Sequence, residues 1–307
     1  MLKKEMWRLL ALCLVAATSQ AEDAQQWLER MSHAHREMSY QGVVSYQVDG
    51  SLSSYKFTHR VVDGSEFEEL RPLDSDDRGL VRHGHSIHCV HPAEQLLRSS
   101  SGQNGSLGQY YDVAIGEPGR VAGRDVITLN ITPRDVFRLS YRIALDSMTA
   151  IPLKTETRDQ SGQVLERFQF MMFELGAPQG GAVGGNAREI SHSAVVSAKA
   201  RVQMLAELPW QPAWIPEGFT LAQPSEAGQG ENGASGALSY TDGMSMFSVF
   251  MESTDSFASA PEASSMRRGA TVSFTYPIPG QNYVATVMGE VPLLTAEQVA
   301  KSVMVKP

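Results

Sequence analysis

Short β-prone runs separated by turn signals constrain the fold of this chain more than any other feature. From Tyr40 onward apolar residues recur at every second position, and turns interrupt them at VDGS (48–51), VDGS (62–65), DSDDRG (74–79) and HGHS (83–86). A period of two is typical of strands that bury one face, and turns this frequent connect neighbouring antiparallel strands. We therefore expect a mainly β protein built on an antiparallel meander.

Two helices are expected beside the strands. Residues 22–39 (EDAQQWLERMSHAHREMS) place apolar side chains at three- and four-residue spacing, with Asp23 as the N-cap. Residues 295–303 (TAEQVAKSV) have the same character, with Thr295 as the N-cap. The first helix is the only strong cover that the sequence offers for one face of the meander.

The start of the chain has the pattern of a cleaved secretory signal peptide. A basic start (Lys3, Lys4, Arg8) precedes an apolar run that is too short to span a bilayer, and small residues flank a cleavage point after Ala21. We therefore expect an exported protein. Cys89 would then be its only cysteine, which excludes an intramolecular disulfide and leaves a dimer linked through Cys89 open.

The charge balance argues against nucleic acid as a partner. The chain carries 26 Lys and Arg and 34 Asp and Glu residues, a net charge of −8. Nucleic acids and anionic membrane surfaces select basic proteins, so neither is expected to be the main partner.

A stretch rich in glycine and alanine, APQGGAVGGNAR, divides the chain after residue 176. Such a stretch, almost without charge, is typical of a domain boundary. We expect a signal peptide over 1–21, an N-terminal domain over 22–176, a linker over 177–204 and a C-terminal β-rich domain over 205–307.

The stretch RHGHSIHCVH (82–91) gathers four histidines and a cysteine, which are common metal ligands. On a strand, however, alternation points Cys89 and His91 to one face and His88 to the other. We therefore predict a hairpin with solvated histidines that binds metal weakly at most, and no functional metal site or cofactor. A metal-dependent enzyme centred on these histidines is the rival interpretation.

Catalytic motifs give no support for an enzyme. The sequence has no G-x-S-x-G elbow and no H-E-x-x-H pair. The glycine-rich stretch at 179–185 follows a strand but precedes no clear helix, so it is not a phosphate cradle. We predict a binding protein, not an enzyme.

The apolar face of the meander is one candidate binding site. If the first helix covers it incompletely, the concave face forms a cavity suited to a lipid or acyl chain. A filled core is the alternative. By alternation along two strands, the candidate cavity residues are Tyr141, Ile143, Leu145, Phe168, Phe170 and Met172.

Aromatic residues in the second domain are candidates for contact with a protein partner. Several lie in the proline-rich segment PWQPAWIPEGF (209–219), and aromatic side chains dominate protein–protein interfaces. Anchoring of the segment in its own domain is the alternative. The candidate partner-binding residues are Trp210, Trp214, Phe219, Phe247 and Phe250.

Taken together, these segments resemble the MucB/RseB family, periplasmic negative regulators of the envelope-stress sigma factor. The resemblance covers essentially the whole mature chain in order. It rests on SYQGVVSY (39–46), YYDV (110–113), RVAGRDVITLNITPRD (120–135), YRIALDSMTAIPLKTETRDQSGQVLERFQF (141–170), WQPAWIPEGF (210–219), YTDGMSMFSVFME (240–252) and GEVPLLTAEQVAKSV (289–303).

The resemblance implies an N-terminal domain similar to LolA and LolB, an open half-barrel sheet covered by helices, and a smaller C-terminal β-rich domain with a terminal helix. It implies a periplasmic protein of a Gram-negative bacterium that binds the periplasmic segment of a single-span anti-sigma factor (RseA or MucA). The protein would shield that segment from site-1 proteolysis and release it when lipid or lipopolysaccharide binds. A periplasmic lipid or lipoprotein carrier is the alternative, and a homo-oligomer is left open.

Overall fold

The computed structural model describes residues 24–62, 65–73, 107–176, 188–190, 209–221, 237–256 and 261–306. The expected signal peptide, its cleavage point and the N-cap Asp23 lie outside these residues. So do the histidine-rich stretch 82–91 and most of the expected linker. Among the described residues, no helix combines the length and the apolar character needed to cross a membrane.

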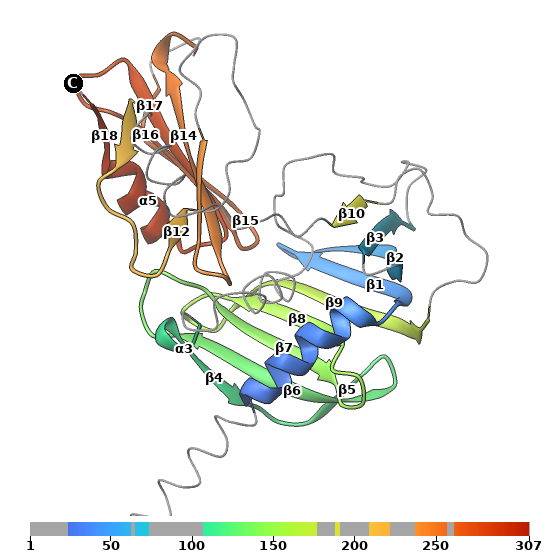
Figure 1. The fold of residues 1–307 in the computed structure, drawn as a ribbon. Helices are drawn as coiled ribbons and strands as arrows, with labels where there is room; N and C mark the ends of the chain where they lie inside the picture. Colours follow the sequence, from blue (N-terminus) through green and yellow to red (C-terminus); the bar gives the residue numbers. More distant parts are fainter. Residues whose placement is uncertain are drawn as a thin grey trace, which may run out of the picture.

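The described residues between Tyr40 and Ile190 form one large antiparallel sheet of ten strands (Figure 1). A short helix α3 (Leu107–Tyr110) leads into it. Across the sheet the order is β10 (Arg188–Ile190), β3 (Ser65–Pro72), β2 (Ser51–Val62), β1 (Tyr40–Val48), β9 (Val164–Leu175), β8 (Pro152–Arg158), β7 (Ser140–Asp146), β6 (Arg124–Pro133) and β4 (Tyr111–Ile115), with β5 (Gly119–Val121) also paired to β6.

Two runs of hairpins meet in the middle of this sheet. The strands β1 to β3 form one run and β4 to β9 the other, and β1 pairs with β9 to join them. Its two outer strands, β10 and β4, do not pair with each other, so the sheet is open. The predicted fold class, mainly antiparallel β with an open sheet, is confirmed.

A helix over residues 24–37 covers one face of the sheet, as the apolar spacing predicts (Figure 1). Leu28 and Met31 pack with residues of β6 and β7, whereas Ala34 packs with residues of β1 and β9. The helix therefore crosses from one run of hairpins to the other.

The C-terminal part forms a separate six-stranded antiparallel sheet and a two-stranded one. The larger has the order β12 (Thr220–Leu221), β13 (Ala237–Thr241), β14 (Met246–Ser253), β17 (Tyr283–Gly289), β16 (Thr271–Pro277) and β15 (Ser264–Arg268), with a 3-10 turn η1 (Thr254–Ser256) after β14. The smaller pairs β11 (Trp210–Pro212) with β18 (Val303–Val305). Helix α5 (Leu293–Lys301) packs on β16 and β17.

The expected cap of this last helix is wrong. Helix α5 begins at Leu293, with Pro292 at the N-cap and no side-chain capping bond. Thr295 lies inside the first turn, fully buried, and its hydroxyl donates to the carbonyl oxygen of Phe137 at 3.0 Å. The hydroxyl therefore connects the second domain to the first, and a proline starts the helix in its place.

Candidate functional site

Aromatic side chains cluster on the helix-covered face of the first sheet. They come from β1, β2 and β9, and neighbouring ring centres lie 5.4 to 6.2 Å apart, mostly edge to face. Contacts of this geometry add to the stabilisation that the burial of apolar area provides. The members of this aromatic cluster are Tyr40, Phe57, Phe168, Phe170 and Phe173.

Five of the six predicted cavity residues lie on the covered face of the sheet. Phe168 and Phe170 belong to the aromatic cluster, and Tyr141, Ile143 and Leu145 pack beneath the N-terminal half of the helix over residues 24–37. None of the five is more than 3% exposed. In this conformation they form a filled core, so a lipid could reach them only if the helix moved.

The sixth residue, Met172, does not share this face. The pairing of β1 with β9 shifts register between Val43 and Val44, which oppose Met172 and Phe170, so β9 carries one extra residue there. Such a bulge reverses the alternation beyond it. Met172 is 60% exposed, and Phe173 packs into the aromatic cluster instead. The expectation that Met172 lies beside Phe168 and Phe170 is wrong.

The predicted partner-binding aromatics lie mainly in the core of the second domain. Trp210, Phe219 and Phe247 are 2%, 8% and 1% exposed, and Phe250 is half-buried. These first three side chains therefore offer almost no surface to a partner in this conformation.

Trp214 is half-buried and faces the first domain. Its ring packs edge to face against Phe137, with ring centres 5.1 Å apart. Trp214 therefore forms part of the junction between the two domains.

At the centre of this junction lies an ion pair that is completely buried. Arg138 donates from Nε to Oδ2 of Asp242 at 2.6 Å, and both side chains are 0% exposed. Arg138 also contacts the Asp135 carboxylate and the carbonyl oxygen of Glu217. A buried charge needs a partner and hydrogen bonds, and Arg138 draws them from both domains.

The carboxylate of Asp242 is equally well satisfied. It accepts the hydroxyl of Tyr111 at 2.9 Å, and its second oxygen accepts the backbone N–H groups of Met244 and Ser245. This oxygen thereby shapes the turn between β13 and β14, which inserts Met244 into the core of the first sheet. Burial raises the pKa of Tyr111, and the Asp242 carboxylate raises it further, so the hydroxyl stays a donor.

A second tyrosine contact lies beside the ion pair. The hydroxyls of Tyr141 and Ser245 lie 2.9 Å apart. Burial raises the pKa of Tyr141, and the Glu290 carboxylate adds to the effect. Tyr141, one of the predicted cavity residues on β7, therefore also holds the two domains together.

The turn between β15 and β16 forms the other side of the junction. The backbone N–H of Gly269 donates to Asp49 and that of Ala270 donates to Glu166, both at 2.9 Å. Gly269 has a φ of +59°, and a Cβ there would lie 2.5 Å from Val48 and against the Glu166 carboxylate. A glycine is therefore required by the backbone angle and by the close approach.

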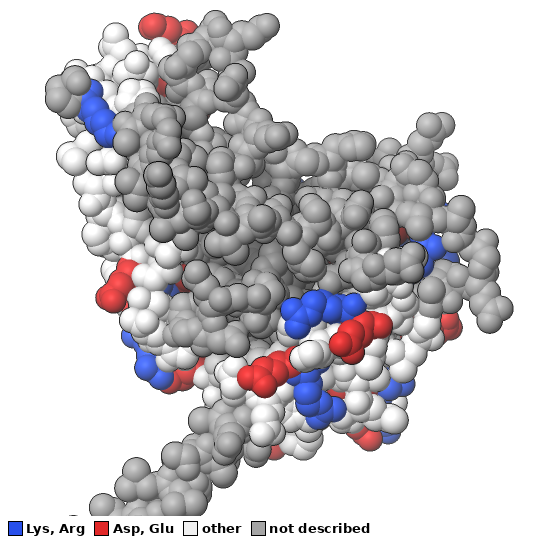
Figure 2. Space-filling view, in the orientation of Figure 1, with Lys and Arg blue, Asp and Glu red and all other residues white. Residues whose placement is uncertain are grey.

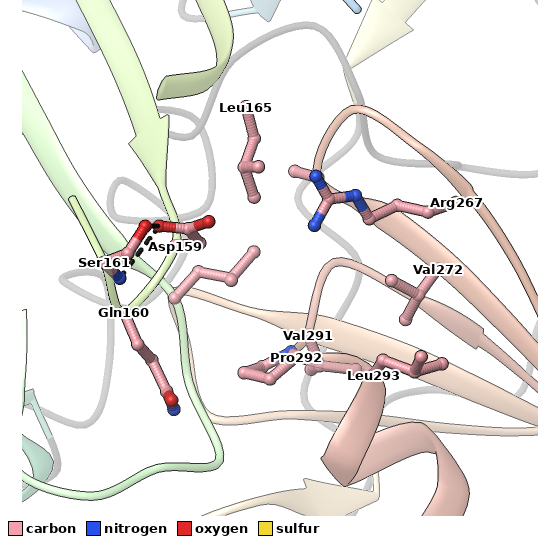
Figure 3. Close-up of a pocket in the computed structure, with 11 residues that line it drawn as sticks. Asp159, Gln160, Ser161, Leu165, Arg267, Val272, Val291, Pro292 and Leu293 are labelled. Carbon is pink, nitrogen blue, oxygen red and sulfur yellow. Dashed lines mark hydrogen bonds between the residues drawn. The ribbon is translucent and has the colours of Figure 1, made fainter. Parts of the chain in front are cut away.

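A pocket of about 220 Å³ opens between the two contact regions (Figure 3). The first domain contributes Leu139, Leu165 and the turn at 159–161, and the second contributes residues of β15, β16 and the start of α5. Typical small-molecule sites have volumes of about 300–1,000 Å³. The smaller volume suits one or two apolar side chains of a peptide better than a lipid tail.

The charge pattern of the described surface is mixed. On the face drawn in Figure 2, basic and acidic side chains of the first domain lie interspersed. On this face the described residues therefore do not form the kind of basic patch that a nucleic acid selects.

Motif analysis of the sequence missed the residues that build the junction. Asp242 lies in YTDG, which contributed to the family resemblance, but Arg138 lies in FRLSYRI without a motif of its own. The available signal was the position of Arg138, between the apolar residues Phe137 and Leu139 and just before the buried strand β7. A charged residue in such a position is expected to have a buried partner.

Comparison with known proteins gives the family of both domains. The family model described as the MucB/RseB N-terminal domain matches residues 23–199, and that described as the MucB/RseB C-terminal domain matches residues 204–304. The sigma factor AlgU regulatory protein MucB of Pseudomonas aeruginosa is 32% identical over 304 residues, which cover 96% of this chain and 95% of that protein.

Solved structures of MucB are similar over nearly the whole chain. The complex structure of Pseudomonas aeruginosa MucA/MucB superposes with a TM-score of 0.71 at 30% identity, covering 93% of this chain and 99% of that one. The crystal structure of MucB described without MucA gives a TM-score of 0.62 over 93% and 98% of the two chains. Both structures therefore share the fold of this chain over nearly its whole length.

Proposed function

Because the chain belongs to the MucB/RseB family, we propose that it is a periplasmic regulatory protein that binds the periplasmic segment of a single-span anti-sigma factor of the RseA/MucA type. The similarity to a solved MucA/MucB complex over 93% of the chain carries this proposal. The chain then works by binding and has no catalytic role.

The partner contacts the second domain, residues 205–307, where it faces the first. The pocket at the junction supports this placement because it accepts apolar side chains and lies between the two domains. Leu293 lines it at 41% exposure, and the exposed Arg267 adds a positive charge for an acidic residue of the partner. Of the predicted aromatic residues, Trp214 and Phe250 contribute surface, and the three buried ones hold the domain in shape.

Calorimetric titration with the purified periplasmic segment of the anti-sigma factor tests the proposal. We expect the wild-type protein to bind with micromolar or tighter affinity. In Leu293→Asp the affinity should fall at least about tenfold, because a charge replaces an apolar side chain that lines the pocket; a tenfold loss corresponds to about 1.4 kcal/mol. Met304→Asp is the matched control, because Met304 is also exposed but lies on β18. Absence of binding by the wild type would refute the function, whereas unchanged affinity in Leu293→Asp would refute only the placement.

Binding shields the anti-sigma factor from its site-1 protease. A segment held against two domains is less accessible to a protease than a free one. Digestion of the segment with the protease, with and without saturating amounts of this protein, measures the effect. Equal cleavage rates in the two reactions would contradict the shielding.

Lipid or lipopolysaccharide releases the segment by entering between the helix over residues 24–37 and the sheet. The aromatic cluster and the residues beneath the helix offer the apolar surface, which is filled in the present conformation. A ligand shifts such an equilibrium only through its higher affinity for one state, and a difference of about 1–3 kcal/mol gives a useful response.

Release is measured by adding lipopolysaccharide to the preformed complex and following the bound segment by size-exclusion chromatography. A stable complex at saturating lipopolysaccharide would exclude this mode of release. Lipid binding without any binding of the segment would favour a carrier.

A further inference from the structure

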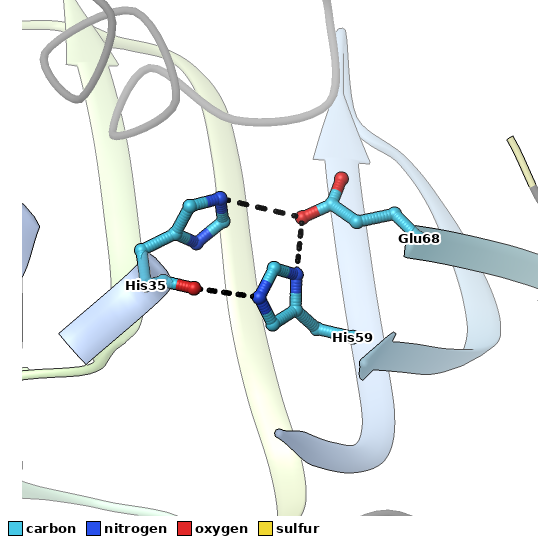
Figure 4. Close-up of side chains that lie close together, drawn as sticks. All are labelled: His35, His59 and Glu68. Carbon is cyan, nitrogen blue, oxygen red and sulfur yellow. Dashed lines mark hydrogen bonds and ion pairs between the residues drawn. The ribbon is translucent and has the colours of Figure 1, made fainter. Parts of the chain in front are cut away.

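Two histidines and a glutamate meet on one side of the first sheet (Figure 4). His35 lies near the end of the helix over residues 24–37, His59 on β2 and Glu68 on β3. His59 and Glu68 stand directly opposite each other in the antiparallel pairing. One ligand-type atom from each of the three residues lies within 4.8 Å of those of the other two.

The hydrogen bonds of His59 determine which of its nitrogens is free for a cation. Nε2 lies 2.8 Å from the carbonyl oxygen of His35, and since a carbonyl only accepts, Nε2 carries the hydrogen. Nδ1 then lies 3.2 Å from Oε1 of Glu68. An ionised carboxylate donates no hydrogen, so either a hydrogen, on Nδ1 or on a neutral Glu68 carboxyl, or a metal ion lies in this contact.

His35 is oriented in a similar way. Its Nδ1 lies 3.3 Å from the hydroxyl of Tyr40, and its Nε2 faces the same oxygen of Glu68 at 3.9 Å. In metal sites a ligating histidine commonly gives its other ring N–H to a carbonyl or a similar group, which fixes its tautomer and its orientation. Both histidines have such an outer contact, to His35 O and to Tyr40.

We propose that His35, His59 and Glu68 bind one divalent transition-metal ion with the ligand preference of zinc. Two imidazole nitrogens and one carboxylate oxygen form a ligand set that zinc uses. Ligands at about 2.0–2.1 Å in tetrahedral geometry lie about 3.4 Å from one another. The pair from His59 and Glu68 is already near this separation, and His35 has to approach Glu68 by about half an ångström from its 3.9 Å. The ligand atoms of the two histidines, which lie within 4.8 Å of each other, have to close by up to about 1.4 Å.

Burial of the group favours a specific site. His59 is fully buried and His35 is 5% exposed, so both rings are held by packing. The Glu68 side chain is 19% exposed, which leaves access for an ion and for a water ligand. The ion takes the place of the hydrogen in the contact between His59 and Glu68, so its binding releases a proton. It ties the covering helix to β2 and β3.

Titration of the untagged, chelator-treated full-length protein with Zn²⁺ tests this site. We expect one equivalent to bind, with proton release, a rise in Tm and, for Co²⁺ in place of Zn²⁺, the visible absorption of a tetrahedral complex. Glu68→Gln keeps the shape of the side chain and removes a ligand charge, so its affinity should fall at least about tenfold.

Two controls separate this site from other histidines. His33→Gln changes a residue on the same helix whose side chain is 67% exposed, and it should leave binding intact. A variant with alanine at positions 83, 85, 88 and 91 removes the histidine-rich stretch and should also bind one equivalent.

Failure of the wild-type protein to bind Zn²⁺ would overturn the proposal and leave a proton in the contact. Loss of the ion in the variant altered at positions 83, 85, 88 and 91 would overturn it too. If Glu68→Gln is not folded by circular dichroism, His35→Gln replaces it, and unchanged affinity in that variant would equally refute the site.

Discussion

At the scale of single residues, the junction depends on groups that are costly to bury alone. Arg138 and Asp242 are separated by 104 positions in the sequence and have no exposed side-chain surface. The guanidinium also lies 4.5 Å from the ring centre of Tyr110 and 4.9 Å from that of Phe219, one ring from each domain. The pair is therefore satisfied only when both domains are in place.

Removal of one member of this pair should destabilise the protein strongly. Arg138→Met should lower the free energy of unfolding by about 3–5 kcal/mol, because it leaves the Asp242 carboxylate buried without a cation. Asp242→Asn should cost less, because Arg138 keeps its contact with the Asp135 carboxylate. The double variant should lose less than the sum of the two, since it leaves no lone charge. Urea denaturation of the four proteins measures this coupling, and strictly additive losses would contradict it.

Glu156 makes the stability of the first sheet depend on pH. Burial acts to raise the pKa of this carboxyl, but hydrogen bonds from Lys154 and Arg158 outweigh it and lower the pKa to about 2. Because the pKa is lower in the folded state, the ionised carboxylate stabilises the fold at pH values above the unfolded pKa of 4.5. This stabilisation is lost as the pH falls toward 2. Between pH 4.5 and about 2 the Tm of Glu156→Gln in thermal melts should therefore fall less than the Tm of the wild type. A parallel decline of the two proteins would contradict the role of Glu156.

At the scale of secondary-structure elements, the pairing of β1 with β9 decides how the sheet is assembled. It joins two runs of hairpins that are each local in the sequence. The bulge at Val43 and Val44 changes which side chains of β9 face the helix. Gly42 stands beside this bulge, and a Cβ there would meet the carbonyl oxygen of Met172 and lie 2.9 Å from the ring of Phe170. Glycine in a strand often marks such a close approach.

Gly42→Ala should therefore destabilise the first sheet. The methyl group forces apart two backbones in the centre of the sheet, and overpacking of this kind costs about 1–3 kcal/mol. Gly108→Ala is the matched control, because a Cβ at Gly108 meets nothing within 4 Å. Guanidinium denaturation compares the two, and equal stability of both variants would show that β1 and β9 can separate at no cost.

At the scale of the whole molecule, two sheets that do not pair with each other share part of one core. Met244 and Ala270 of the second domain belong to the apolar cluster of the first sheet. The junction is fastened on one side by Arg138 and on the other by the turn at Gly269. A change at either side should therefore alter the relative position of the domains before it alters either sheet.

Gly269→Ala should loosen this junction. Gly269 and Gly280 both have positive φ, at +59° and +73°, so alanine strains the backbone at either position. Only at Gly269 does the new methyl also collide with the first domain, and Gly280→Ala is therefore the control. Hydrogen exchange at residue 270 should accelerate and the radius of gyration from small-angle scattering should rise in Gly269→Ala alone. The same behaviour in both variants would assign the effect to backbone strain.

Local patterns in the sequence were sufficient to predict most of the strands and the covering helix. The period of two along residues 141–145 predicts a strand that buries Tyr141, Ile143 and Leu145, and all three are buried. The spacing over residues 22–39 predicts the covering helix, because side chains three and four positions apart share a helical face. These properties depend on neighbours within a few residues.

Properties that depend on distant residues required the tertiary structure. Alternation along β9 predicts that Met172 faces the same side as Phe168 and Phe170. The bulge in the pairing with β1 turns Met172 to the other side, and the sequence of β9 alone does not reveal this bulge. An aromatic residue is equally suited to a protein interface and to a core, so the sequence does not distinguish the two for Trp210 and Phe247. The packing of the second domain places both in its core.

The sequence by itself determined an open antiparallel sheet with a covering helix, a second β domain and the family to which both belong. Only the tertiary structure decided that Arg138 meets Asp242 and that His35, His59 and Glu68 converge. The reason is physical: periodicity and turn chemistry report which face of an element is buried, whereas an ion pair or a ligand set depends on which distant faces meet. For the ion pair, the meeting is determined by the packing of the second domain on the first. For the ligand set, it is determined by the pairing of β2 with β3 and by the packing of the helix over residues 24–37 on the sheet.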